Sequence, residues 1–225
     1  MANNSTLEIR KICVFCGASS GNDPKYVNGA KAMGNALVKE NIGLVYGGGN
    51  LGLMGEIART VVSGSGTSAV TGVIPAALAP REISGQLIGE VHTVPDMHSR
   101  KALMASHSDA FIAMPGGFGT FEELLEVLTW QQLGFHAKPI GLLNINKFWD
   151  PLLAFLDHTV SQEFVQQRHR DALIVSEDPE ELIRKLKAFK PTPSLLEEIR
   201  NKNGGVVPVG VDISKTSDEA ESFNE

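Results

Sequence analysis

Short apolar runs alternate along the chain with segments in which apolar residues recur every three to four positions. An unbroken apolar run predicts a strand buried on both faces, and the longer period predicts an amphipathic helix. Asp23 followed by Pro24 is a typical helix start, because aspartate caps and proline suits the first helical position. The pattern predicts strands at residues 11–18, 43–46, 69–74, 91–94, 109–114, 139–144 and 172–176, and helices at residues 24–40, 52–63, 99–108, 120–133, 150–158 and 177–189.

Strands that alternate with helices of this length predict βαβ units and a parallel sheet. We therefore expect an α/β fold: a Rossmann-like, doubly wound, mostly parallel sheet with helices on both faces, formed as one domain by residues 9–190. Residues 1–8 are expected to be flexible. The segment 191–225 is expected to be mostly disordered and acidic, since residues 201–225 hold five acidic residues, two lysines and one aromatic residue. Ligands of such sheets bind beyond the carboxyl ends of the strands.

The net charge of −6 and the pI near 5.6 argue against a broad nucleic-acid surface. No apolar run reaches the roughly 18–20 residues of a membrane span, and the first residues lack the apolar core of a signal peptide, so a cytoplasmic protein is expected. Cys13 and Cys16 have the CxxC spacing of zinc or redox sites, but no second pair of metal ligands accompanies them. Their place in an apolar run favours small core residues, and no metal site is predicted.

Glycine clusters follow three predicted strands, at residues 17–21 (GASSG), 47–52 (GGGNLG) and 116–119 (GGFG). Each could serve only as a tight turn. Three on one sheet edge favour a phosphate-bearing ligand, because glycine lets backbone N–H groups approach an anion. Residues 47–52 match the dinucleotide fingerprint, but no acidic residue for the ribose occurs between Arg59 and Arg81, which disfavours NAD. A P-loop motif is absent from the sequence. These loops make Gly17, Ser19, Gly48 and Gly49 candidate ligand contacts.

Residues 98–129 carry most of the candidate chemistry. Arg100 and Lys101 open a predicted helix on which Met104 shares the face of Arg100. A second helix follows the third glycine loop, so a phosphate at its start would meet free N–H groups and the Thr120 hydroxyl. Structural explanations compete with this one. Thr120 and Glu123 have the spacing of a capping box, the two cations could form a solvated face, and Glu82 could be an ordinary loop charge.

Two blocks resemble the signatures of the Lonely Guy (LOG) family of cytokinin riboside 5′-monophosphate phosphoribohydrolases, once labelled "possible lysine decarboxylase". Residues 115–123 (PGGFGTFEE) resemble its PGGxGTxxE motif, and residues 97–101 (MHSRK) resemble its second motif. Residues 16–20 (CGASS) and 46–55 (YGGGNLGLMG) also match family blocks in order and spacing. The resemblance covers residues 9–190. It implies a Rossmann-like homodimer, active near the subunit interface, that needs no cofactor.

The resemblance also implies a reaction: hydrolysis of the N-glycosidic bond of an N6-substituted AMP, and of AMP itself as a further candidate, giving free base and ribose 5-phosphate. It places the catalytic pair on Arg100 and Glu123. A carboxylate suits this chemistry, since it can stabilise an oxocarbenium-like centre or activate water, while arginine can orient the phosphate or assist departure of the base. The family's nucleotide-binding residues fall on Glu82, Lys101, Gly117, Phe118, Gly119, Thr120, Phe121, Glu122 and Thr129.

Two other functions remain open at the level of the sequence. A nucleotide-binding sensor on the same scaffold would use the glycine loops without turnover, although a pure binder has no need of a carboxylate beside the sugar. The lysine decarboxylase label would need a Schiff-base lysine and an acidic partner for pyridoxal phosphate. Lys101 is the one lysine inside a site block, next to an arginine on a helix start, and it fits that role poorly.

Overall fold

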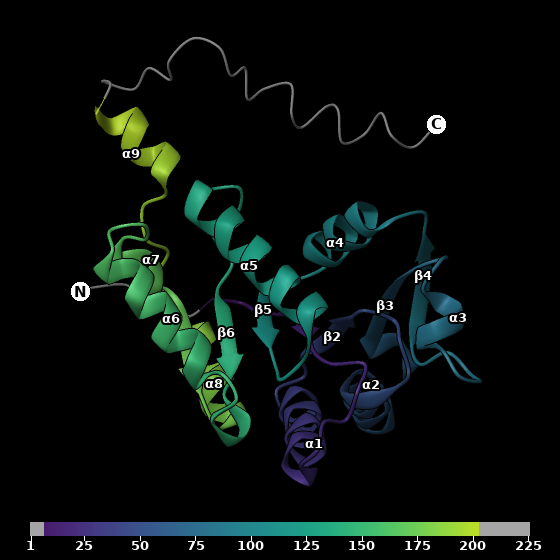
Figure 1. The fold of residues 1–225 in the computed structure, drawn as a ribbon. Helices are drawn as coiled ribbons and strands as arrows, with labels where there is room; N and C mark the ends of the chain where they lie inside the picture. Colours follow the sequence, from purple (N-terminus) through teal and green to yellow (C-terminus); the bar gives the residue numbers. More distant parts are fainter. Residues whose placement is uncertain (1–6, 203–225) are drawn as a thin grey trace.

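Parallel strands form a single sheet in the order β4-β3-β2-β1-β5-β6-β7 (Figure 1). The computed structural model describes residues 7–202. Each strand pairs in parallel with its neighbours, as in Ile12 with Ala110 between β1 and β5. The predicted Rossmann-like, doubly wound architecture is confirmed. The strands are β1 (Lys11–Phe15), β2 (Gly43–Tyr46), β3 (Val70–Pro75), β4 (Glu90–Val94), β5 (Ala110–Ala113), β6 (Ile140–Leu143) and β7 (Leu173–Ser176).

Helices cover both faces of the sheet, with α1 and α2 on one side and α4 and α5 on the other (Figure 1). Helix α8 joins the face of α1 and α2, while α6 packs on the face of α4 and α5. The helices are α1 (Pro24–Lys39), α2 (Gly52–Ser65), α3 (Ala79–Glu82), α4 (Met97–Ser106), α5 (Phe118–Leu133), α6 (Asp150–Ser161), α7 (Gln167–Asp171), α8 (Pro179–Lys187) and α9 (Leu195–Lys202), with 3-10 turns η1 (Thr67–Ala69) and η2 (Ile145–Lys147).

The central strand β1 explains why the predicted runs are apolar without alternation. Ile12 and Val14 pack against α1 and α2, whereas Cys13 and Phe15 pack against the helices of the opposite face. Both faces are therefore dry, and every position of the strand favours an apolar side chain. The two cysteines are buried and free, which confirms them as core residues, and burial raises the pKa of both thiols well above its usual range.

The strand order reverses between β1 and β5, which creates a crevice at their carboxyl ends. From β1 the chain proceeds outward to β2 and β3, and from β5 it proceeds the other way to β6 and β7. Beyond these strands the chain consequently turns toward opposite faces of the sheet, to α1 after β1 and to α5 after β5. Open α/β sheets bind their ligands at this place.

Helix α9 lies inside the segment 191–225 that the sequence predicts to be mostly disordered. Ser194 and Glu197 form a capping box at its start: the Ser194 N–H donates to Glu197 Oε2 at 2.7 Å, and the Glu197 N–H donates to Ser194 Oγ at 3.2 Å. Glu198 pairs with Arg168 of the α7 helix. Residues 203–225 of that segment, and residues 1–6 of the predicted flexible N-terminus, lie outside the described residues.

Candidate active site

The three predicted glycine loops meet at the carboxyl edge of the sheet. The Gly17 N–H donates to the Pro115 carbonyl at 3.0 Å, and the Leu53 N–H donates to the Gly17 carbonyl at 3.0 Å. A Cβ on Gly116 would lie 2.1 Å from Thr120 Oγ1 and 2.9 Å from the Gly17 nitrogen, so only glycine allows this approach. The contacts join the loops after β1, β2 and β5 into one surface.

Arg100 is buried at this edge, with 6% of its surface exposed. It sits in the first turn of α4, whose start is capped by Asp96 through a 2.8 Å hydrogen bond from the Ser99 N–H. Its Nη2 donates to the Gly47 carbonyl at 3.3 Å. A Cβ at position 47 would stand 2.0 Å from that Nη2 atom, which explains why the loop needs glycine there.

Glu123 reaches the same place from α5 and is 8% exposed. The helix begins at Phe118, two residues before the predicted start, and its N-cap Gly117 makes no side-chain capping bond. Thr120 is consequently a helical residue, and the capping box suggested by the Thr120–Glu123 spacing does not form. The Glu123 side chain is left directed at Arg100, with its Oε1 4.0 Å from Arg100 Nε.

Glu82 completes the charged cluster from the end of α3, with its Oε2 3.9 Å from Arg100 Nη2. Neither separation is a hydrogen bond. Within the described residues, Glu82 Oε2 and Arg100 Nε are buried without a hydrogen-bond partner. Burial raises the pKa of Glu123 to about 7, although Arg100 opposes the shift. A buried carboxyl group that titrates near neutrality beside a fixed cation is typical of a catalytic acid or base.

A cavity of about 240 Å³ opens onto these three side chains. Gly17, Gly117, Gly119 and Thr120 line it together with Arg100, Glu123 and Glu82. A second cavity of about 460 Å³ adjoins it, sharing Gly17, Ala18 and Gly117, and is lined further by Ser19, Tyr26, Leu53 and Phe148. The sequence therefore identified the polar residues that topology brings together here.

Comparison with known proteins identifies the family. Residues 54–186 match the model of a family described as "Possible lysine decarboxylase". Cytokinin riboside 5′-monophosphate phosphoribohydrolase LOG3 of Arabidopsis thaliana is 50% identical over 184 residues, which cover 82% of this chain and 85% of LOG3. LOG1 of the same plant is 51% identical over 184 residues, covering 82% of this chain and 85% of LOG1. The chain belongs to the LOG family.

Solved structures at low identity share the fold of this LOG-family chain. The molybdenum cofactor binding protein from the phototrophic bacterium Rippkaea orientalis superposes with a TM-score of 0.60 at 22% identity, covering 81% of this chain and 98% of that one. The Moco carrier protein from Chlamydomonas reinhardtii gives a TM-score of 0.59 at 21% identity, covering 80% and 96%. At this identity the likeness concerns the architecture alone.

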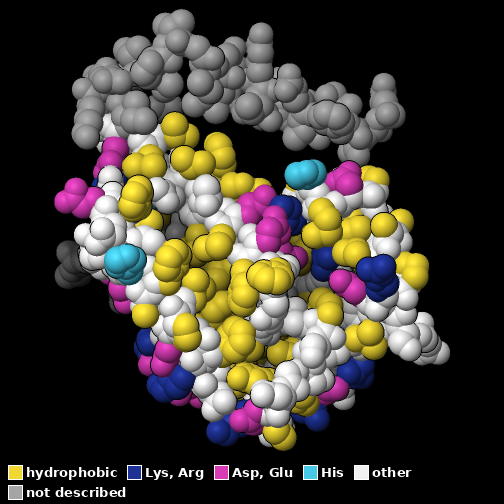
Figure 2. Space-filling model, in the orientation of Figure 1, with side chains coloured by type: hydrophobic (Ala, Val, Ile, Leu, Met, Phe, Trp, Pro, Cys, Tyr) yellow, Lys and Arg dark blue, Asp and Glu magenta, His cyan; other side chains and the backbone are white. Residues whose placement is uncertain are grey.

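Lys101 follows Arg100 in the sequence, but it does not line the cavity that opens onto Arg100 in this LOG-family chain. Its ammonium group pairs with Glu122 and, at 3.0 Å, with Glu126, both on α5. Burial lowers the pKa of Lys101, and these two hydrogen bonds more than offset it, so the net shift is upward. Figure 2 shows acidic and basic side chains gathered between α4 and α5. Lys101 therefore joins two helices, and Glu122 pairs with it outside the cavity.

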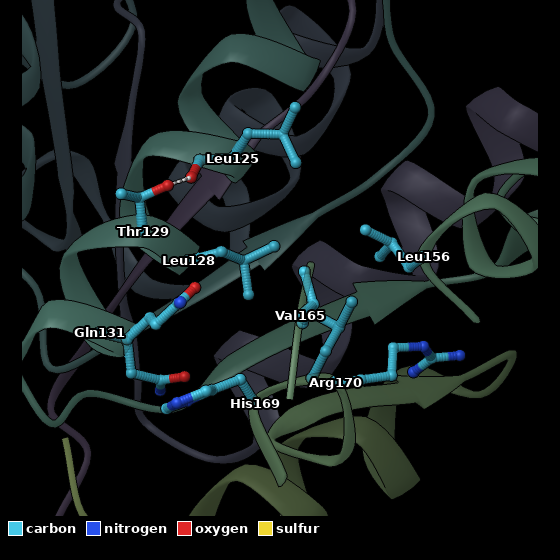
Figure 3. A pocket seen from close by; sticks show the side chains of 10 residues that line it. Leu125, Leu128, Thr129, Gln131, Leu156, Val165, His169 and Arg170 are labelled. Atoms are coloured by element: carbon cyan, nitrogen blue, oxygen red, sulfur yellow. Dashed lines mark hydrogen bonds between the residues drawn. The ribbon is translucent and has the colours of Figure 1, made fainter. Parts of the chain in front are cut away.

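Thr129 lines a different cavity, of about 150 Å³, between α5 and the segment that holds α6 and α7 (Figure 3). Its hydroxyl donates to the Leu125 carbonyl at 2.7 Å, and Leu156, Val165 and His169 stand opposite. Other predicted contacts also do not line the cavity that opens onto the charged cluster. Phe118 is 90% exposed, Phe121 packs against Phe148 and Trp149, Met104 is in the core, Gly48 packs on Ile74 and Gly49 packs on Glu82.

Several cavity residues were not assigned to the site from the sequence. Cys16, Gly47, Met54 and Met97 line the cavity with Arg100. Each belongs to a block that resembles the LOG family, so the blocks themselves carried the signal. Among residues 7–202, no group of three or more His, Cys, Asp or Glu side chains is arranged to hold a metal ion. No helix of that stretch is long and apolar enough to cross a membrane.

Proposed function

We propose that this chain hydrolyses the N-glycosidic bond of a cytokinin riboside 5′-monophosphate, releasing the free base and ribose 5-phosphate. The observation that carries the proposal is the buried Arg100 between Glu82 and Glu123, at the edge where the three glycine loops meet. The names of the LOG relatives support the substrate class. Residues 9–190 are the proposed catalytic domain.

The start of α5 is the proposed phosphate site. The first N–H groups of a helix have no acceptor within the helix. In α5 the first N–H group with such an acceptor is that of Phe121, which donates to the Gly117 carbonyl at 3.1 Å, so the N–H groups before it are available to a ligand. Gly117 and Gly119 have open space where a Cβ would stand, so a phosphate can approach the backbone closely. The helix dipole favours the anion at this end.

Glu123 is the proposed catalytic carboxylate. In the reaction the bond between C1′ and the base nitrogen breaks, a bond from C1′ to a water oxygen forms, and the proton that this water loses ends on the leaving base. Ionised Glu123 stabilises the positive charge that develops at C1′ and accepts a proton from the attacking water. A pKa near 7 keeps a large share of Glu123 ionised at neutral pH. Arg100 orients the substrate and balances the negative charge of the Glu123 carboxylate.

The active form is proposed to be a homodimer in the cytoplasm, docked through α5 and α6. Hydrophobic side chains gather over these two helices (Figure 2). Phe118 is 90% exposed, Leu125 44% and Phe155 59%, which is unusual for large apolar side chains outside an interface. Thr129 lies one turn after Leu125 on the exposed side of α5. Dimer formation is proposed to bring Thr129 to the substrate, although the cavity that Thr129 lines within its own subunit lies apart from the charged cluster.

The test is an assay for ribose 5-phosphate released from isopentenyladenosine 5′-monophosphate, from AMP and from isopentenyladenosine without phosphate. We expect the first substrate to be turned over and the nucleoside to be nearly inert, since it lacks the group that α5 binds. Nucleotide binding without product from either nucleotide would overturn the hydrolase proposal and favour a sensor.

A further inference from the structure

The segment between β3 and β4, residues 76–89, holds Glu82 but has little packing of its own. We call it the strap. None of its residues is fully buried, Leu87 is 54% exposed, and α3 spans only Ala79–Glu82. Ile88 packs against the hydrophobic core, but it lies six residues beyond Glu82. Polar contacts must therefore hold the Glu82 carboxylate in position.

Asn50 supplies most of these contacts. Its side-chain Nδ2 donates to the Ser84 carbonyl at 2.8 Å and to the Gln86 carbonyl at 2.9 Å, while its Oδ1 accepts from the Ser84 N–H at 2.8 Å. Its backbone N–H donates to the Glu82 carbonyl at 2.9 Å. Asn50 is 7% exposed, so water does not compete effectively for these bonds.

The loop that carries Asn50 also holds Arg100. Gly47, three residues earlier, accepts the hydrogen bond from Arg100 Nη2. Between them, a Cβ on Gly49 would stand 3.2 Å from the Glu82 Cβ, so this loop packs directly on the strap. Arg59 fixes the far side of the loop by donating to the Asn50 carbonyl at 3.1 Å. One loop thus fixes both members of the Glu82–Arg100 pair.

We propose that Asn50 is a positioning residue of the reaction, which holds the strap so that the Glu82 carboxylate stays beside Arg100. The inference rests on the proposed function. Aspartate cannot replace Asn50, because it accepts from the Ser84 N–H but has no donor for the two carbonyls. Loss of Asn50 frees the strap, moves Glu82 away from Arg100 and weakens the site without removing any group from it.

A double-mutant cycle tests this proposal. Asn50→Ala, Glu82→Ala and the double variant are compared with the wild type by kcat/KM on isopentenyladenosine 5′-monophosphate, with Tm measured for each. We expect Asn50→Ala to lower kcat/KM by about tenfold or more. In the Glu82→Ala background, the same change should cost less than about threefold, because Asn50 acts through Glu82.

Gln86→Ala is the matched control, since Asn50 contacts only its backbone, and it should leave kcat/KM unchanged. If Asn50→Ala does not fold, Asn50→Asp replaces it in the cycle. If the wild type is active and the losses of kcat/KM from the two single variants multiply in the double variant, Asn50 does not act through Glu82. That result would overturn the role of Asn50 and leave the proposed function intact. A wild type that neither turns over the nucleotides nor binds ribose 5-phosphate in calorimetry would overturn the proposed function, and the inference with it.

Discussion

The Arg100 guanidinium and the Glu123 carboxylate face each other at 4.0 Å, Nε to Oε1, without forming a hydrogen bond. Both side chains are buried, and the Nε–H group has no partner within the described residues. A closed ion pair would satisfy both groups and hold the carboxyl group ionised. The open pair instead leaves a donor and an acceptor available to a ligand between them.

Removing either member of this pair should abolish turnover and spare the fold. We expect Glu123→Gln and Arg100→Ala to lower kcat by roughly 10²–10⁴-fold, the usual contribution of a positioned acid–base group. The measurement is ribose 5-phosphate release, with circular dichroism to verify folding. Glu180→Gln, an exposed glutamate on α8, is the control and should retain full activity. A near-wild-type rate in either variant would contradict the assignment of that residue to the catalytic pair.

The raised pKa of Glu123 makes its burial costly at neutral pH. The unfolded chain releases this proton near pH 4.5 and the folded protein near pH 7, so stability from this group is complete below pH 4.5 and falls as pH rises to 7. The Glu123→Gln substitution abolishes this pH-dependent loss of stability, which amounts to about 3 kcal/mol of unfolding free energy above pH 7. Calorimetric Tm values should thus show a larger gain at about pH 8 than at about pH 5. An equal gain at both pH values would contradict the shift.

Lys101 is expected to stabilise the contact between α4 and α5. Lys101→Met leaves Glu122 and Glu126 without their cation, which we expect to cost about 2 kcal/mol and to lower Tm by roughly 4–8 °C. Glu126→Gln should cost less, because the amide oxygen still accepts the hydrogen bond. An unchanged Tm together with a raised KM would instead assign Lys101 to the substrate, as the family resemblance implies.

The exposed apolar face of α5 should govern assembly. Leu125→Lys places a charge in the proposed interface, so we expect light scattering to report monomers and the activity to fall. Leu87→Lys is the matched control, since Leu87 is a similarly exposed leucine on the strap, and it should leave the dimer unchanged. A wild type that is monomeric at assay concentration and still active would contradict the dimer proposal.

The fold could be predicted because its strands are buried on both faces and its loops carry glycine. Elements without these signals were missed. Helix α3 has four residues, too few to show a period, and α9 lies in a polar segment where its capping box was overlooked. The sequence pattern places the start of α5 two residues too late, because Gly119, a poor helix former, stands in the first turn.

The site could be predicted in part for a geometric reason. The glycine loops and the charged cluster follow strands, and the carboxyl ends of parallel strands meet at one edge. Neighbours on a helix do not stay together in this way, since successive residues point about 100° apart. Arg100 therefore faces the cavity while Lys101 faces α5, and Thr129 lies beyond the reach of Glu123 along the same helix.

The side chain of Asn50 recognises the strap only through backbone atoms of Ser84 and Gln86. The side chains at these two positions are consequently not part of the attachment. Substitutions there can accumulate without detaching the segment that carries Glu82. The strap is thus a segment whose sequence can drift at these two positions while Glu82 keeps its place beside Arg100.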